Sequence, residues 1–463
     1  MCAALLVASL ATACGGGDGG DTSAGGPTAQ APGDGVPVVV DTDLALDDLV
    51  ALAFLLSSPA AEVRAVTVSG TGEVRCPQGL TVIRGLLALT GDDDVPVACG
   101  RSSPLAGDHA FPNEWRDLAD SGWGMDLSQV TAPATERSAV DLLGTTLRQG
   151  GVTLLTLGPL TNVAESLRAE PDLAEQVSSV VVMGGALDVP GNVSGRGIGS
   201  STAEWNMYVD PTAAAEVVAS GAPIVLVGLD ATNQLPITGD FLELLTVNAR
   251  TEPAKLVDRL IRNNPQVYTG EAYFWDALAA AVVLDPGLVT TEEAAITVLT
   301  TQGRDSGRTV RRPDGTTVTI AHRPRAAAFE TLLLRTLDRL PPGAALATPP
   351  PPVGRAVIRF DGSRCSYEGP ATVPSGRMRF TFDTTDPAWT GAVVGLTGER
   401  SIQAILAWLE AHPHSRDSVP GVRQVAPVPP RVTTYLDVAS PSVATICASD
   451  EPVPLLAGTV TVE

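Results

Sequence analysis

Short runs of β-branched residues alternate with longer segments of helical periodicity between residues 36 and 340, and this alternation limits the possible folds. Runs such as Val36–Val40 and Val152–Leu157 have the composition of strands buried on both faces. The pattern predicts an α/β domain with a mainly parallel sheet flanked by helices. Strands are expected at 36–40, 63–68, 95–98, 152–157, 180–183 and 224–227, and helices at 47–56, 79–89, 139–148, 160–168, 211–220 and 240–249.

The last part of the chain has a different character. The segment 340–353 is rich in proline and alanine, as in a semi-rigid linker. Short alternating strands divided by Gly, Pro and Asp turns follow it, with one helical stretch near 402–409, and they predict a small β-sandwich. The expected organisation is a leader at 1–14, a flexible tether at 15–35, the α/β domain at 36–340, a Pro-rich linker at 341–352 and an accessory β-sandwich at 353–463.

The N-terminus resembles an export signal. A short apolar run ends in Leu10-Ala-Thr-Ala13 before Cys14, similar to the lipobox of bacterial lipoproteins, whose cysteine is acylated. A tether rich in Gly, Ser, Thr and Asp follows. The alternative is a small core helix with an incidental cysteine. We expect an exported protein, anchored by lipid at Cys14 to the outer face of the cell membrane, or secreted.

Four cysteines remain once the two in the leader are assigned to export. They fall in pairs within the two predicted domains, and no CxxC motif or Cys/His cluster indicates a zinc site. In an oxidising compartment such pairs favour disulfides, whereas free buried thiols are the alternative if the protein is not exported. The predicted disulfides are Cys76–Cys99 and Cys365–Cys447.

The chain is strongly acidic, with a formal net charge of −22 and one lysine, Lys255, beside 29 arginines. Such a chain lacks the basic surface that binds nucleic acid, and it is repelled by anionic lipid head groups. We therefore expect no nucleic-acid partner, and membrane contact only through the lipid anchor.

Four carboxylates lie within eight residues directly after the first predicted strand, in Asp41-Thr-Asp43-Leu-Ala-Leu-Asp47-Asp48. The first two point the same way along an extended segment, and the last two begin the next helix. Carboxylates that converge repel one another, and a hard divalent cation relieves that repulsion. We expect a metal site here rather than a solvated N-cap cluster.

This segment and several later motifs resemble the nucleoside hydrolase family, the inosine-uridine preferring nucleoside N-ribohydrolases. The resemblance covers residues 36 to about 340. The motifs occur in family order: Val40–Asp48, Leu157-Gly-Pro-Leu-Thr-Asn162, Met183-Gly-Gly185, Gly191-Asn192, Ala203-Glu-Trp-Asn206, Asp210-Pro211 and Trp275-Asp-Ala-Leu-Ala279.

The resemblance implies Ca²⁺-dependent cleavage of the bond between ribose C1′ and the base, through an oxocarbenium-like transition state. By motif position, Asp43 resembles the general base on metal-bound water. Asp48 and Asp276 resemble the main cation ligands. The backbone carbonyl of Leu157 resembles a further ligand, and Asp41 resembles a residue that supports the ligands or binds the cation directly. The ribose-binding set would be Asp47, Asn192, Glu204 and Asn206, although a loop turn also explains Asn192.

Two positions depart from the common family pattern. Thr71 follows Gly70 where Asn is frequent, so a contact to water or ribose is shortened or lost. Trp275 stands where many members carry a histidine acid, and none of the four histidines lies in a matching motif. Stacking a purine on Trp275 is the expected alternative, with Trp115 as an opposing wall. Plain structural roles for Trp275, in the core, and for Trp115, as a loop anchor, stay open.

Two other functions are consistent with part of this pattern. A haloacid dehalogenase-type phosphatase also places Asp-x-Asp after a strand, around Mg²⁺, but needs a lysine, and Lys255 lies in a surface-like helix start. A surface lipoprotein that binds nucleosides without turnover would not need the base Asp43. We therefore expect an enzyme that favours purine nucleosides, with self-association into homo-oligomers as in its relatives.

Overall fold

The structure is a computed structural model. It describes residues 35–463 except 128–136, 194–201, 265–266, 268–271, 342, 387, 412–419, 429, 431–432, 439–440 and 450–453. The expected leader, most of the tether and Cys14 lie outside the described residues. No helix in the described part is long and apolar enough to cross a membrane.

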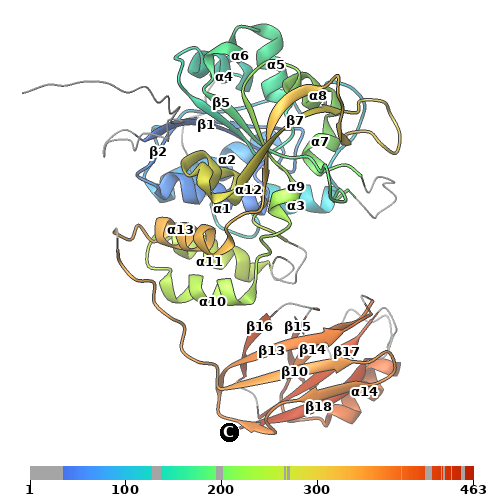
Figure 1. The fold of residues 1–463 in the computed structure, drawn as a ribbon. Coiled ribbons are helices and arrows are strands. Elements are labelled where there is room, and N and C mark those ends of the chain that lie inside the picture. Colours follow the sequence, from blue (N-terminus) through green and yellow to red (C-terminus); the bar gives the residue numbers. More distant parts are fainter. Residues whose placement is uncertain are drawn as a thin grey trace, which may run out of the picture. The chain divides into compact units, whose positions relative to one another are not determined.

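The central sheet confirms the predicted α/β fold (Figure 1). Its nine strands have the order β3-β2-β1-β4-β5-β6-β9-β7-β8. Strand β1 (Val36–Thr42) pairs in parallel with β2 (Ala61–Val68) on one side and β4 (Thr153–Thr156) on the other. The other parallel strands are β3 (Val97–Cys99), β5 (Ser179–Met183), β6 (Ile224–Val227) and β9 (Thr316–His322).

One edge of the sheet is antiparallel and was not predicted. Strand β7 (Thr290–Val298) pairs with both β9 and β8 (Thr309–Arg311) in antiparallel register. The first four residues of β7 are exposed, so this strand lacks the continuous apolar run of the buried strands.

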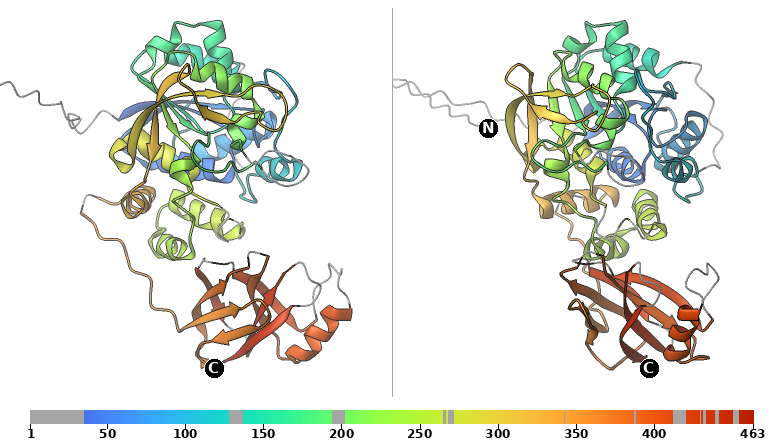
Figure 2. Two further views of the ribbon diagram at one scale, coloured as in Figure 1. Left: turned by 45° about the vertical axis from the view of Figure 1, so that its right-hand side comes forward. Right: turned by 90° about the vertical axis from the view of Figure 1, so that its right-hand side faces the viewer.

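Helices cover both faces of the sheet (Figure 1 and Figure 2). Val38 and Val40 point into one apolar core and Val39 into the other, as the alternation of side chains along a strand requires. The first core contains α1 (Leu46–Ser57), α2 (Cys76–Thr90), α10 (Gly239–Asn248), α11 (Glu252–Asn263), α12 (Trp275–Leu284) and α13 (Ala326–Leu337). The second contains α4 (Ala139–Leu147), α5 (Thr161–Ala169), α6 (Leu173–Gln176) and α8 (Pro211–Val218).

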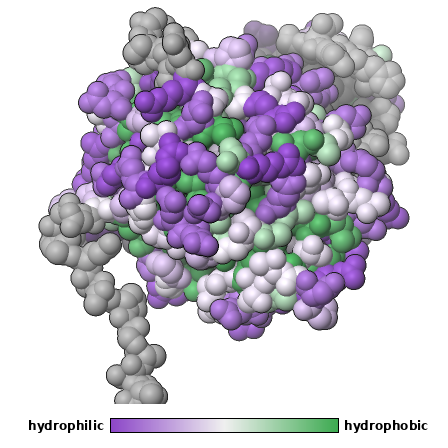
Figure 3. All heavy atoms as spheres, turned by 90° about the horizontal axis from the view of Figure 1, so that it is seen from above, coloured by the Kyte–Doolittle hydropathy of each residue, from purple (hydrophilic) through white to green (hydrophobic). Residues whose placement is uncertain are grey.

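Three short helices and a 3-10 turn complete this domain. They are α3 (Asn113–Asp120), α7 (Trp205–Val209), α9 (Leu229–Thr232) and η2 (Pro286–Leu288). Hydrophilic side chains dominate the face drawn in Figure 3, with small apolar areas between them.

The C-terminal strands form two separate sheets around one core, in agreement with the predicted sandwich. The first sheet has the order β11-β10-β13-β16 and the second β12-β18-β17-β14-β15. Ile358 and Phe380 from the first sheet pack with Val443 and Val460 from the second. Helix α14 (Ile402–Ala411) covers the outer side of the second sheet. The strands are β10 (Gly354–Phe360), β11 (Cys365–Glu368), β12 (Thr372–Val373), β13 (Gly376–Thr384), β14 (Thr390–Leu396), β15 (Val422–Val428), β16 (Thr433–Val438), β17 (Ser442–Ala448) and β18 (Leu455–Val462).

Both predicted disulfides are present. Cys76–Cys99 joins the start of α2 to the end of β3, and Cys365–Cys447 joins β11 to β17, one strand from each sheet of the sandwich. Each bond therefore ties two elements that are distant in sequence, which restricts the unfolded chain.

Candidate active site

The segment after β1 turns sharply into α1 and brings the aspartate motif to the carboxyl edge of the sheet. Leu44 adopts a left-handed backbone with φ of 55°, which is uncommon for a non-glycine residue. It is fully buried, and the indole N–H of Trp123 donates to its carbonyl at 3.1 Å. The turn is therefore fixed by its surroundings, in the place where open α/β sheets bind ligands.

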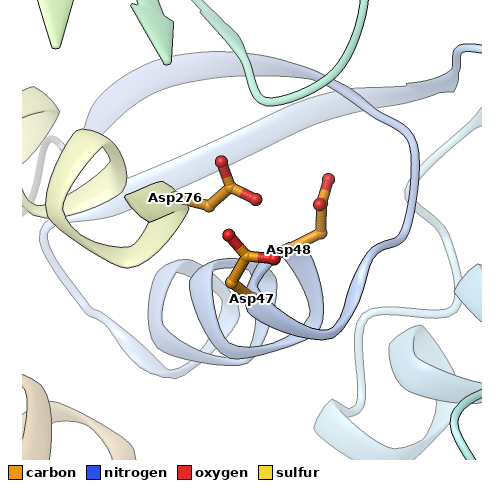
Figure 4. Close-up of side chains that lie close together, drawn as sticks. All are labelled: Asp47, Asp48 and Asp276. Carbon is orange, nitrogen blue, oxygen red and sulfur yellow. The ribbon is translucent and has the colours of Figure 1, made fainter. Parts of the chain in front are cut away.

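Three carboxylates converge at this turn (Figure 4). Asp47 and Asp48 lie in the first turn of α1, and Asp276 lies in the first turn of α12. One carboxylate oxygen from each lies within 4.8 Å of the others. Because both helices point their positive ends here, the site favours anions despite their mutual repulsion.

The hydrogen bonds of this group leave some buried oxygens without a partner. Asp48 Oδ1 accepts from the backbone N–H of Asp43 at 3.1 Å and from the hydroxyl of Thr42. Asp41 Oδ1 accepts from Thr67 Oγ1 at 2.6 Å and Asn162 Nδ2 at 2.7 Å. The buried oxygens without a hydrogen-bond partner include Asp41 Oδ2, Asp48 Oδ2 and Asp276 Oδ1.

Burial raises the pKa of every carboxyl in this group, and repulsion by neighbouring carboxylates raises the pKa of Asp41, Asp47 and Asp276 further. The pKa of Asp41 and of Asp47 rises to about 7, in both cases mainly because of burial. The pKa of Asp276 rises well above its usual value because of burial and then the nearby Asp47 and Asp48. Buried carboxylate oxygens without partners fit a hard cation, which prefers oxygen ligands.

Asp43 is held by the loop that follows β2. Its Oδ2 accepts the backbone N–H of Glu73 at 3.1 Å, and its carbonyl accepts the N–H of Val74 at 3.0 Å. Gly72 packs against the same side chain, and a Cβ added there would lie 2.1 Å from the Asp43 Cβ. A residue with a side chain would not fit at Gly72, so the glycine allows this close approach.

Thr71, in the loop after β2, makes side-chain contacts within the protein. Its hydroxyl lies 3.0 Å from the hydroxyls of both Ser69 and Thr161. The Thr71 hydroxyl therefore bonds within a hydroxyl network that reaches α5, and it makes none of the hydrogen bonds described above for the aspartates.

Glu73, two residues further along this loop, is not among the residues predicted for the site. Glu73 is 8% exposed, and its Oε2 is buried without a hydrogen-bond partner. Burial raises its pKa well above the usual value, Asp47 and Asp48 raise it further, and Arg116 lowers it. A glutamate so soon after a buried strand, Val63–Val68 in the prediction, was the available signal.

Two of the predicted sugar-binding residues, Glu204 and Asn206, lie near the ends of β4 and β5. Glu204 caps α7: Oε1 accepts the N–H of Asn206 at 2.9 Å, and Oε2 accepts those of Gly185 at 3.0 Å and Met207 at 3.2 Å. Asn206 Nδ2 donates to the carbonyl of Leu157 at 2.8 Å. The structure therefore brings Glu204, Asn206 and Leu157 together.

Asn192 joins this group through the backbone. Its Oδ1 accepts the N–H of Trp205 at 3.1 Å. The side chain thus orders the start of α7, which agrees with a structural role beside the predicted ribose contact.

The two tryptophans predicted as base walls have different surroundings. Trp275 is half-buried, lies 5.5 Å from the Tyr273 ring and donates from Nε1 to Asn233 Oδ1 at 3.4 Å. Trp115 lies edge-on to Trp205, 5.3 Å between ring centroids. Among the described residues no ring contact joins Trp115 to Trp275.

Lys255, His109 and His322 make their contacts with residues other than the aspartates of this centre. Lys255 pairs with Glu252 at the surface of α11 at 2.9 Å, so the phosphatase rival lacks its lysine. His109 stacks on Tyr208, and His322 lies 3.2 Å from Glu292. His412 and His414 lie outside the described residues.

Comparison with known proteins decides the family. A family model described as inosine-uridine preferring nucleoside hydrolase matches residues 38–332. The chain belongs to this family.

Related nucleoside hydrolases differ in their described specificity. The pyrimidine-specific ribonucleoside hydrolases RihA of Citrobacter koseri and Escherichia coli O7:K1 are 34% and 33% identical, and each match covers 59% of this chain and 88% of the relative. The solved inosine-uridine preferring enzyme of Bacillus anthracis has a TM-score of 0.60 at 28% identity, covering 66% of this chain and all of that one. The solved purine-preferring enzyme of Gardnerella vaginalis has a TM-score of 0.56 at 27% identity, covering 66% and 98%.

The C-terminal β-sandwich lies outside this family match. The chain is therefore a ribonucleoside hydrolase with additional C-terminal sheets.

Proposed function

We propose that this nucleoside hydrolase uses Ca²⁺ to cleave the N-glycosidic bond of purine ribonucleosides, giving ribose and the free base. The main support for this proposal is that Asp41, Asp48 and Asp276 each have a buried carboxylate oxygen without a hydrogen-bond partner. Together with the Leu157 carbonyl, these would hold the cation. When bound, such a cation lowers the pKa of water and holds hydroxyl groups.

Asp43 is proposed as the general base. Its Oδ2 is oriented by the Glu73 N–H, and the carboxylate would take the proton from the attacking water. The nearby carboxylates would stabilise the positive charge that develops at C1′ as the base leaves. Glu204, Asn206, Asp47 and Asn192 would bind the sugar.

Trp275 supports the preference for purines, because a half-buried indole beside Asp276 offers a face on which a two-ring base stacks. A preference for pyrimidines is the second candidate, since relatives more than 30% identical are described as pyrimidine-specific. These two candidates share the site and differ only in the base.

The test is a panel of inosine, guanosine, adenosine, uridine and cytidine, read for base release with and without a chelator. We expect higher kcat/KM for the purines, with activity lost on chelation and restored by Ca²⁺. Faster turnover of uridine and cytidine than of the purine nucleosides would show that the enzyme prefers pyrimidines. Binding of nucleosides without base release would support the non-hydrolytic binder.

We also propose that the protein is exported and anchored through acylated Cys14. The two disulfides support export, because such bonds persist in oxidising compartments. Labelling of cells with a radioactive fatty acid should mark the wild-type protein, and Cys14→Ser should abolish the label. Equal labelling of both would contradict the anchor.

A further inference from the structure

The loop after β2 contributes a carboxylate that neither the family motifs nor the predicted site includes. In residues 69–73, the hydroxyls of Ser69 and Thr71 bond to each other, and Gly70 and Gly72 have no side chain. Glu73 is more than nine-tenths buried, with Oε2 enclosed and unpartnered. Glu73 therefore carries the one carboxylate of residues 69–73, and its backbone N–H donates to Asp43 Oδ2 at 3.1 Å.

Glu73 is not required by the fold in the way that Glu204 is. Glu204 accepts three backbone N–H groups, whereas the hydrogen bond from Glu73 to Asp43 uses only its backbone N–H. A buried carboxylate oxygen without a partner destabilises a protein. Such a group is typically retained where a ligand supplies the missing donor.

Glu73 lies outside the set of residues proposed above to hold the cation, so we consider a hydroxyl group as its partner. Glu73 is not one of the three residues whose oxygens converge, which are Asp47, Asp48 and Asp276. Asp47, a predicted ribose-binding residue, is the carboxylate with the strongest electrostatic effect on Glu73. A sugar hydroxyl is the donor that a nucleoside would bring to this place.

We infer that Glu73 is an additional substrate-binding residue, whose free carboxylate oxygen accepts a hydrogen bond from a hydroxyl of the sugar. This inference rests on the proposed function of the site. Arg116, whose Nη2 donates to the Gly70 carbonyl at 3.0 Å, anchors the loop from α3 and provides the opposite charge.

The experiment compares Glu73→Ala with wild type on a ribonucleoside and on its 2′-, 3′- and 5′-deoxy forms. We expect Glu73→Ala to lower kcat/KM for the ribonucleoside about 10- to 100-fold, the value of a hydrogen bond to a charged group. For the deoxy substrate that lacks the partner hydroxyl, the loss should shrink to about twofold. Equal losses on all substrates, or no loss, would overturn the inference.

Three further measurements exclude a structural role. Glu73→Gln keeps an acceptor and should recover part of the loss. Both variants should raise the melting temperature of the metal-free protein, because they remove an unpartnered buried charge. Ca²⁺ affinity, measured by calorimetry, should stay unchanged, and a tenfold loss would assign Glu73 to the cation instead. Glu216→Ala, at a surface ion pair with Arg168, is the control.

A binding measurement distinguishes failure of this inference from failure of the proposed function. In an Asp43→Asn background, dissociation constants of the same four nucleosides should show the same dependence on Glu73. That measurement needs no turnover, so absence of hydrolysis by wild type would refute the function alone. Absence of the dependence in binding and in turnover would refute the role of Glu73.

Discussion

The buried acidic residues proposed for this site are held in two different ways. Asp48 and Asp276 keep oxygens without hydrogen-bond partners and repel each other. Glu204 uses both oxygens to accept backbone N–H groups from two segments of the chain. In the proposed function a cation completes the first pair, whereas backbone N–H groups already satisfy Glu204. Hydrogen-bond satisfaction, rather than burial, therefore separates the proposed cation ligands from the carboxylate that caps α7.

The largest expected effect on activity comes from replacing Asp43, the proposed general base. Asp43→Ala should lower kcat about 1,000-fold, because positioned general bases contribute about 10²- to 10⁴-fold. The measurement is base release from the preferred nucleoside under saturating Ca²⁺. Asp172→Ala, at an exposed position before α6, is the matched control. Full activity of Asp43→Ala would refute its role as the base.

The next effect tests the proposed cation ligands. Asp276→Asn should lower kcat/KM about 100-fold or more, since even groups that only support metal ligands contribute about 10- to 100-fold. It should also raise the melting temperature of the metal-free protein, because one of several converging charges is removed. A lower melting temperature would mean that Asp276 stabilises the fold directly.

A matched substitution at Glu204 should lower the stability of the protein, whereas Asp276→Asn should raise it. Glu204→Gln replaces a charged acceptor of three backbone N–H groups by a neutral one that still offers a single acceptor oxygen. We expect a loss of about 1–3 kcal/mol in the free energy of unfolding, with or without Ca²⁺. Unchanged stability in chemical denaturation would remove the distinction between the two groups.

The dependence of stability on pH sharpens the same comparison. The pKa of Asp41 and Asp47 is raised from 3.8 to about 7, so the folded state binds more protons than the unfolded state between these values. The metal-free protein should therefore lose stability as pH rises through about 7. Melting temperatures in chelator should be higher at pH 6 than at pH 8, and Ca²⁺ should stabilise most at pH 8. The reverse order in chelator would contradict the raised pKa of these two carboxyls.

The sequence predicted the sheet and the aspartate motif because both are local patterns. Buried parallel strands show continuous apolar runs, and the motif directly follows one of them. Glu73 was missed because its place soon after a strand is a weak signal and its burial depends on tertiary contacts. The antiparallel β7 was missed because its first four residues are exposed. The hydrogen bond from Gly185 to Glu204 joins residues 19 apart in sequence, so no local pattern predicts it.

The smallest expected effect on activity comes from a residue proposed to contact the nucleobase rather than the sugar. Trp275→Ala should lower kcat/KM for inosine about tenfold, and for a nitrophenyl riboside hardly at all, because that leaving group needs no protonation or stacking. Trp115→Ala is the comparison, since Trp115 packs on Trp205 and should affect both substrates equally. Equal losses on both substrates with Trp275→Ala would show that the indole supports the start of α12 instead. The base side of the site would then be structural, like the Glu204 cap, and specificity would have to come from other residues.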